Sequence, residues 1–216
     1  SGSLTIPSTL GGYPVTSIGN SAFCYCSSLA SVVIGNSVTN IGDKAFYDCS
    51  KLTSVTIPDS VTSIGDSAFF YCDSLTAINV SENNPAYTSA NGILFNKSLT
   101  ALIQCPGSFS GSYTIPDSVT SIGDSAFYDC TKLTSVNIPD SVKSVGDWAF
   151  GWCASLASVT IGNSVTDIGG YAFCYCSSLA SVVIGNNVIA IGDRAFYNCD
   201  SLTSVNIPNS VTTIGR

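Results

Sequence analysis

Ten cysteines give this 216-residue chain its most obvious capacity for chemistry, because thiols form disulfides, bind zinc and act as nucleophiles. Seven of them share one position, eight residues after the first residue of a recurring Ile-Gly or Val-Gly pair: Cys26, Cys49, Cys72, Cys130, Cys153, Cys176 and Cys199. Equivalent positions in a repeating chain face one environment, and free cysteine is among the most buried residue types. We interpret this column as buried thiols, with disulfides or a metal site as alternatives. The chain has no histidine, and its Cys-x-Cys spacing is shorter than that of zinc sites, so we predict no metal site.

The carboxylates also recur at fixed positions. One column follows a Pro or Gly and reads as a turn: Asn36, Asp59, Asp117, Asp140, Asn163, Asn186 and Asn209. A second stands two residues after the recurring Ile or Val, where a helix N-cap is expected: Asp43, Asp66, Asp124, Asp147 and Asp193. Turn and cap positions therefore account for most of the carboxylates. The sequence contains neither a phosphate-binding loop nor a nucleophile beside a base. We predict no catalytic residues, no cofactor and no enzymatic activity. A solenoid hydrolase with clustered acids has less support, since Glu82 stands alone.

Large aromatic residues occupy two columns that elsewhere carry polar residues. The third position after the Ile or Val holds Ser21, Lys44, Ser67, Ser125, Trp148, Tyr171 and Arg194, and the seventh holds Tyr25, Asp48, Tyr71, Asp129, Trp152, Tyr175 and Asn198. Because most residues at these positions are polar, we expect both columns to face solvent. Trp, Tyr and Arg are the residue types enriched at binding hot spots. We predict that Trp148, Trp152, Tyr171, Tyr175 and Arg194 form an exposed partner-binding patch. The alternative is that these rings lie flat on the surface and serve only local stability.

The positions of these columns come from a strict repeat. The Ile-Gly or Val-Gly pair recurs at Ile18, Ile41, Ile64, Ile122, Val145, Ile168, Ile191 and Ile214, and six of the seven intervals are 23 residues. A fixed period of this length indicates a solenoid. The fold class that we predict is an α/β repeat solenoid, a right-handed coil of 23-residue units with one strand and one short helix or 3-10 turn per repeat.

Each coil can be read in order. In Ser54-Val55-Thr56-Ile57 apolar and polar residues alternate, as in a strand with one buried face. A turn follows, Gly65 lets the chain bend, and Ala68, Phe69 and Cys72 have the spacing of one helical face. Strands stack about 4.8 Å apart and helices about 8 to 10 Å, so we expect the strands on the concave side. The polar residues exposed there form a second candidate partner-binding face: Ser54, Thr56, Ser135, Asn137, Ser158, Thr160, Ser204 and Asn206.

The recurring pattern LxxVxIPxSVxxIGxxAFxxC resembles the BspA-like class of leucine-rich repeats, found in surface proteins of anaerobic bacteria and of some parasitic protists. The resemblance covers nearly the whole chain. It implies a leucine-rich repeat solenoid and a role in adhesion or in binding host matrix or other proteins, and it brings no catalytic residues.

We predict one solenoid domain over residues 1–216, with regular repeats at 1–80, the first of them a variant, an atypical hairpin-like repeat at 81–112, and regular repeats at 113–216. The interval from Ile64 to Ile122 is 58 residues, which is 12 more than two repeats need. Within it, 93–95 and 101–103 read as two strands around Asn96-Lys97-Ser98. The chain has no Met and no signal-like segment, so we expect it to be a piece of a longer product.

The formal net charge of −7 comes with only seven Lys and Arg residues, which are dispersed. This excludes the basic surface that nucleic acids or anionic membranes require, and no apolar run is long enough to enter a bilayer. We predict an extracellular or cell-surface module for adhesion or protein binding, whose partner is a host matrix or surface protein or a glycan. A structural spacer in a large surface protein is the alternative, and a carbohydrate-binding role has less support.

Overall fold

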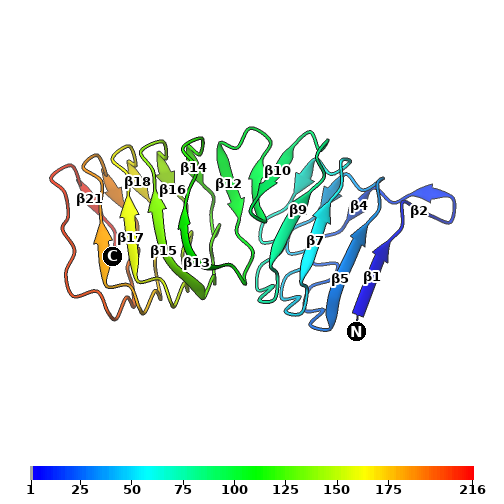
Figure 1. The fold of residues 1–216 in the computed structure, drawn as a ribbon, viewed down its shortest axis with the longest axis horizontal. Coiled ribbons are helices and arrows are strands. Elements are labelled where there is room, and N and C mark those ends of the chain that lie inside the picture. Colours follow the sequence, from blue (N-terminus) through cyan, green and yellow to red (C-terminus); the bar gives the residue numbers. More distant parts are fainter. Residues whose placement is uncertain (1) are drawn as a thin grey trace. The chain divides into compact units, whose positions relative to one another are not determined.

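The structure is a computed structural model that describes residues 2–216. Its chain divides into two compact units, residues 2–98 with 106–108 and residues 99–105 with 109–216 (Figure 1). The boundary falls inside the predicted atypical repeat. Each unit is a β-solenoid with the predicted 23-residue spacing. That the whole chain is one continuous solenoid domain stays a prediction.

The first unit contains two sets of parallel strands and two antiparallel hairpins. The longer parallel strands pair β1 with β5 and β7 with β9, and the shorter ones form the order β4-β6-β8. The hairpins are β2-β3 and β10-β11. The bounds are β1 Gly2–Ile6, β2 Thr9–Leu10, β3 Tyr13–Pro14, β4 Ser17–Ile18, β5 Leu29–Ile34, β6 Asn40–Ile41, β7 Ser54–Ile57, β8 Ser63–Ile64, β9 Ala77–Val80, β10 Tyr87–Ala90 and β11 Ile93–Asn96.

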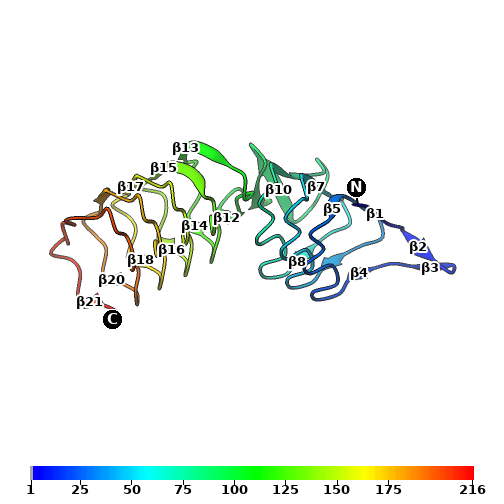
Figure 2. The ribbon, with the colours of Figure 1, turned by 90° about the horizontal axis from the view of Figure 1, so that it is seen from below.

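The second unit is a stack of coils with two parallel sheets. One sheet has the order β13-β15-β17-β19, and the other runs from β12 through β14, β16, β18 and β20 to β21. Figure 2 shows β13, β15 and β17 along one side of this unit and β14, β16, β18 and β20 along the other. The bounds are β12 Ala101–Gln104, β13 Ser110–Thr114, β14 Ser121–Ile122, β15 Lys132–Ile138, β16 Ser144–Val145, β17 Ser158–Ile161, β18 Asp167–Ile168, β19 Ser181–Val183, β20 Ala190–Ile191 and β21 Thr213–Ile214.

The core lies between the two sheets of each unit and follows the repeat. In the longer strands buried and exposed residues alternate, as in Ser54–Ile57 and Ser158–Ile161, so the predicted strand pattern is confirmed. The phenylalanine column fills the opposite side of the core. In the second unit Phe127, Phe150 and Phe173 are fully buried, and successive rings stack with centroids 4.7 and 5.0 Å apart. Each phenylalanine therefore contacts the equivalent phenylalanine of the next coil.

The predicted helix or 3-10 turn in each repeat is wrong, because the described residues contain no helix. The segment after the Ile-Gly pair is a turn in which alternate amides bond locally and to the next coil. Gly151 N–H donates to Trp148 C=O, whereas Phe150 N–H donates to Ala172 C=O at 2.7 Å. The third and seventh positions have positive φ, for example 58° at Trp148 and 62° at Trp152. A left-handed residue twice in five positions interrupts any helix.

The recurring Asp is therefore not a helix N-cap. Its side chain accepts a hydrogen bond from the backbone of the next coil instead: Asp147 N–H donates to Asp124 Oδ1 at 2.9 Å, and Gly170 N–H donates to Asp147 Oδ1 at 2.7 Å. The turn column behaves in the same way where Asn186 N–H donates to Asn163 Oδ1 at 3.1 Å. Both columns therefore form hydrogen-bonded ladders between successive coils.

A second short strand in each coil is a further difference from the one-strand prediction. It contains the Ile or Val of the recurring pair, as in Ser144–Val145, and lies opposite the longer strand. Because turns and short strands replace helices, the wide helix spacing that motivated the predicted curvature is absent. Phe ring centroids 4.7 to 5.6 Å apart show that coils on this side are spaced much like strands.

The predicted strands around Asn96-Lys97-Ser98 exist as β11 and β12, and the segment before them adds a further hairpin, β10-β11. Its turn is Asn91-Gly92, and both residues have positive φ, 53° and 76°. An Asn-Gly pair favours this tight turn. Asn84 holds the hairpin to the preceding coil, because its buried amide donates to the carbonyls of Pro58 and Val61 at 2.7 and 2.9 Å.

Candidate functional site

The aromatic surface cluster of the second unit consists of Trp148, Trp152, Tyr171, Tyr175 and Arg194. The two Trp residues belong to one turn and the two Tyr residues to the next turn. The rings form two stacks: Trp148 lies on Tyr171 with centroids 4.2 Å apart and planes 3° apart, and Trp152 lies on Tyr175 at 4.1 Å and 18°. The structure therefore brings the five predicted residues together on one surface.

Arg194 extends the cluster into a third coil. Its Nη1 donates a hydrogen bond to the Tyr171 hydroxyl at 2.9 Å. Its guanidinium carbon lies 5.7 Å from the centroids of both Tyr171 and Tyr197, a distance typical of a cation–π contact. The Arg194 guanidinium thus lies at the Tyr171 end of the Trp148–Tyr171 stack.

The rings are not part of the solenoid core. Trp152 is 43% exposed, and Trp148, Tyr171 and Tyr175 are half-buried. Their backbone conformation is left-handed, which bulky side chains adopt at a cost and Asn or Asp adopt more readily. The turn tolerates Ser, Lys, Asp and Asn at the same positions, so the backbone itself does not require rings there. Stacking offsets part of that cost.

Sequence analysis missed the sixth position after the Ile or Val, which decides how the rings fit. It holds Gly151 and Cys174 in the two coils of the cluster, and Tyr128 and Tyr197 in the coils on either side. A Cβ at Gly151 would come within 3.2 Å of both Trp148 and Tyr128. Tyr128 contacts Trp148 edge to face at 6.0 Å, and Tyr197 contacts Tyr175 at 5.5 Å. The tyrosines at this sixth position, Tyr128 and Tyr197, were the sequence signal that could have identified it.

The first unit has a smaller aromatic cluster of the same kind. Tyr47 contacts Tyr25 and Tyr71 edge to face, with ring centroids 5.7 and 5.2 Å away. Burial raises the pKa of Tyr47 to about 12, helped by the neighbouring Tyr71 and Tyr25. No flat stacked pair occurs among these three rings.

The predicted polar strand face lies partly in each unit. Ser54 and Thr56 project from β7 and are exposed, as are Ser158 and Thr160 of β17. In β15 Asn137 is exposed and Ser135 is half-buried, while Ser204 and Asn206 are exposed but lie outside any strand. In the second unit Asn137, Thr160 and Asn206 line a groove of about 480 Å³ that also contains the turn residues Asp140 and Asn163. The face is polar and has no aromatic anchor.

The cysteine column is buried in six of its seven positions, which confirms the core-thiol interpretation there: Cys49, Cys72, Cys130, Cys153, Cys176 and Cys199. None of the ten cysteines, all of which lie in the described residues, forms a disulfide. Five of these buried thiols have a partner that sequence analysis did not foresee, the carbonyl of a phenylalanine in the preceding coil: Cys49, Cys72, Cys153, Cys176 and Cys199. Cys153 Sγ donates to Phe127 C=O at 3.1 Å, and Cys176 Sγ donates to Phe150 C=O at 3.1 Å.

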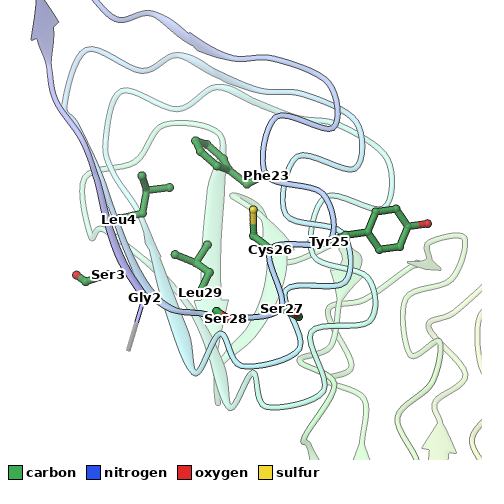
Figure 3. A pocket seen from close by; sticks show the side chains of 9 residues that line it. All are labelled: Gly2, Ser3, Leu4, Phe23, Tyr25, Cys26, Ser27, Ser28 and Leu29. Carbon is green, nitrogen blue, oxygen red and sulfur yellow. The ribbon is translucent and has the colours of Figure 1, made fainter.

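For Cys26 the prediction of burial is wrong. Cys26 lies on the first coil and lines an open pocket of about 420 Å³ with Phe23, Leu4 and Leu29. Figure 3 shows these side chains directed into the coil interior, while Tyr25 points outward. No coil of the described chain covers this side, so its thiol reaches solvent.

Thiol labelling should therefore separate Cys26 from the column. Burial raises the pKa of Cys72 to about 12 and that of Cys49 to about 11, so at pH 8 their reactive thiolate forms are scarce. We expect Cys26 to react with an alkylating reagent in the folded protein and Cys72 and Cys153 to react only after unfolding, as read by mass spectrometry. Cys26→Ser is the control that removes the fast phase. Fast native labelling of Cys153 would contradict the core assignment.

No group of His, Cys, Asp or Glu side chains in residues 2–216 is arranged to hold a metal ion. Over the same residues, no helix is long and apolar enough to cross a membrane.

Coiled parallel strands, a 23-residue period and a stacked apolar column define a leucine-rich repeat solenoid. The BspA type leucine rich repeat region matches residues 2–109 and 107–216 in six copies. The chain belongs to this family, which confirms the resemblance found in the sequence.

Solved structures agree with that assignment. A leucine rich cell surface protein from Faecalibacterium prausnitzii is 31% identical, with a TM-score of 0.72, over 99% of this chain and 59% of that one. The pneumococcal vaccine antigen PcpA is 22% identical, with a TM-score of 0.76, over 99% and 62%, and shows the fold alone. A leucine rich repeat protein from T. pallidum is 31% identical, with a TM-score of 0.54, over 82% and 77%. The chain thus spans about three-fifths of the length of the first two. A comparison with curated proteins finds no match.

Proposed function

We propose that this chain is a cell-surface module for adhesion or protein binding that uses the aromatic surface cluster to hold its partner. The observation that carries the proposal is the pair of ring stacks at columns where most other coils have Ser, Lys, Asp or Asn. Large rigid rings lose little conformational entropy on binding and supply much contact area. The similarity to a protein described as a leucine rich cell surface protein supports the location.

The polar strand face is a less favoured site for the same function. Solenoids often bind partners on such a surface. The hydroxyls and amides of this one supply hydrogen bonds, but they lack the buried aromatic or arginine anchors that dominate binding energies.

A structural spacer in a larger surface protein is the second candidate function. It is favoured by one feature of the cluster, namely that the stacked rings cover each other and so contribute to local stability.

Replacing Trp148 by Ser and Trp152 by Asp tests the proposal, because these are the residues of the coil that contains Ile122. The double variant should fold and lose no more than about 1 to 3 kcal/mol of unfolding free energy, the value of two aromatic pairs. Binding to a partner found by screening host matrix proteins and glycans should weaken about tenfold or more. Affinity is measured by surface plasmon resonance and folding by thermal denaturation.

Tyr25→Asp is the matched control, because Tyr25 is an exposed ring at the seventh position of a coil in the first unit. It should leave binding unchanged. Undiminished binding by the Trp148→Ser/Trp152→Asp variant would exclude the cluster as the site. A loss of stability with no partner in the screen would favour the spacer.

A further inference from the structure

The polar groove of the second unit crosses several coils on the side of the longer strands. Its volume of about 480 Å³ is within the range of small-molecule binding sites. A second hollow of about 400 Å³ continues it and shares Asn186 and Asn206 with it. The two hollows therefore form one groove, which runs over the coils that contain β15, β17 and β19 and over the coil that follows them.

One wall of the groove is a row of equivalent residues on the strand face. Asn137 is paired with Thr160 in the parallel ladder, and Thr160 with Val183, so these side chains lie side by side along the unit. Asn206 has the same position in the next coil. Because neighbouring strands are about 4.8 Å apart, the row extends over about 14 Å. A ligand that fills the groove must therefore be long and must present similar groups to each coil.

The turn column supplies the other wall, and the ladder between coils fixes how its side chains face. Asn163 N–H donates to Asp140 Oδ1, and Asn186 N–H donates to Asn163 Oδ1 at 3.1 Å. Only the oxygen of a carboxamide accepts, so the NH₂ group of Asn163 is the part left for a ligand. Within residues 2–216 no protein group bonds to that NH₂ group or to the exposed carboxamides of Asn137 and Asn206.

The groups that line the groove suit a neutral ligand rich in hydroxyls. A carboxamide both donates and accepts hydrogen bonds, and so does a hydroxyl. No Lys or Arg lines either hollow, and Asp140 is the one charged residue there. Residues 99–105 and 109–216 contain eight Asp, no Glu and four Lys or Arg, a formal charge of 4 − 8 = −4. An acidic ligand would thus meet repulsion and no counter-ion.

Small apolar contacts accompany these polar groups. Val183 is 56% exposed within the row, and the half-buried rings of Pro139 and Pro208 line one hollow each. Such surfaces contact the C–H groups of a sugar and leave its hydroxyls to the carboxamides. A peptide is served less well, because peptide strands add to open sheet edges, and β17 is already paired on both sides. The groove also has none of the Trp, Tyr or Arg residues that are enriched in protein interfaces.

We propose that this groove binds a neutral, extended glycan, a β-1,4-linked chain of hexoses that lies along the second unit. Each sugar of such a chain is about as long as the spacing between two coils. Successive sugars then meet equivalent side chains. Asn137, Thr160 and Asn206 exchange hydrogen bonds with hydroxyls, and Val183 contacts the C–H groups of one ring. The site shares no residue with the aromatic surface cluster, so it adds a second ligand to the proposed function.

The test is a titration of the chain with cellopentaose, β-1,4-mannopentaose and chitopentaose, followed by side-chain amide signals in NMR spectra. One or more of these sugars should shift the signals of Asn137 and Asn206 and saturate them. The disaccharide of the same sugar covers less of the groove and should bind about fivefold more weakly or worse. The pentasaccharide with its C6 hydroxyls oxidised to carboxylates keeps the shape and adds negative charge, and it should also bind about fivefold more weakly or worse.

Asn137→Ala and Asn79→Ala form a matched pair. Both residues are exposed at the same position of the longer strand, but Asn79 lies on β9 of the first unit, outside the groove. Asn137→Ala should weaken binding of the pentasaccharide about threefold or more, and Asn79→Ala less than about 1.5-fold. Asn163→Asp keeps the oxygen that the ladder uses and removes the NH₂ group, and the same column already holds Asp140. This variant should keep its thermal stability and bind about fivefold more weakly.

Failure of all the pentasaccharides to bind would overturn the proposal, and so would equal effects of the two alanine variants. A shift confined to the indole N–H of Trp152 would place the sugar on the aromatic surface cluster and would also overturn it. The Trp148→Ser/Trp152→Asp variant should bind the pentasaccharide as the unchanged chain does. If it does so and also keeps the screened partner, the glycan site stands and the proposed function is wrong. If no sugar binds and the variant loses that partner, the glycan site alone is wrong.

Discussion

Replacing Phe127 by alanine should lower the free energy of unfolding by about 3 to 5 kcal/mol. Phe127 is fully buried, stacks on Phe150 at 4.7 Å and contacts Tyr113 at 6.0 Å. Removing the ring leaves a cavity inside a stack whose coils are held by their neighbours, so the loss should spread beyond one coil. Urea denaturation measures the free energy, and hydrogen exchange should show reduced protection around Phe150 as well.

Phe196→Ala is the matched control in the same column. Its ring is half-buried and stacks on Phe173 at 5.3 Å, so its removal should cost clearly less, about 1 to 2 kcal/mol. A loss below about 0.5 kcal/mol for Phe127→Ala would be typical of a surface position and would contradict the observed packing.

The strands and the core could be predicted because their signals are local and repeated. Val55 and Ile57 alternate with Ser54 and Thr56, and this pattern determines which face is buried. The phenylalanine and cysteine columns follow from the same register. The exception, Cys26, depends on which coil lies next to it, and a column pattern does not contain that information.

The helix prediction failed because its spacing signal is shared by another structure. The spacing of Ala149, Phe150 and Cys153 would bury all three side chains on one face of a helix. The observed turn buries the same three side chains. What distinguishes the turn is positive φ at Trp148 and Trp152. Such positions usually signal themselves by Gly or Asn. Here Asn198 is the one Asn among them, and the other coils hold Ser, Lys, Asp, Trp, Tyr or Arg, so the repeated positions carry no consistent signal in the sequence.

The candidate site was predictable as a set of residues but not as a geometry. The column comparison identifies Trp148, Trp152, Tyr171 and Tyr175 without any structure. It does not reveal that the rings stack in parallel, since this depends on the small residue Gly151 and on backbone angles.

The recurring glycine was predicted to let the chain bend, and the structure assigns it another role. The φ angle of Gly169 is outside the left-handed region, so flexibility is not what the position requires. Its Cα faces the backbone of the preceding coil. A Cβ there would lie 2.5 Å from the Gly146 carbonyl carbon and 2.6 Å from the Asp147 nitrogen, distances that real side chains essentially never show.

Gly169→Ala should therefore lower the free energy of unfolding by about 3 kcal/mol, because backbone atoms must separate to admit the methyl group. Separation also lengthens two hydrogen bonds between coils, from Gly169 N–H to Val145 C=O at 2.8 Å and from Gly170 N–H to Asp147 Oδ1 at 2.7 Å. Urea denaturation gives the free energy, and faster exchange of the Gly169 and Gly170 amides would locate the strain.

Gly19→Ala tests the cause, because Gly19 occupies the same position in the first coil and a Cβ there meets nothing within 4 Å. Alanine also restricts the unfolded chain, so this variant should be neutral or more stable by up to about 1 kcal/mol. If bending were the reason for glycine, the two substitutions would destabilise the protein to a similar degree. A loss confined to Gly169→Ala would instead show that the Ile-Gly pair is kept by the close approach of successive backbones, which is the contact that sets the spacing of the coils and hence the 4.1 to 4.2 Å spacing of the stacked rings.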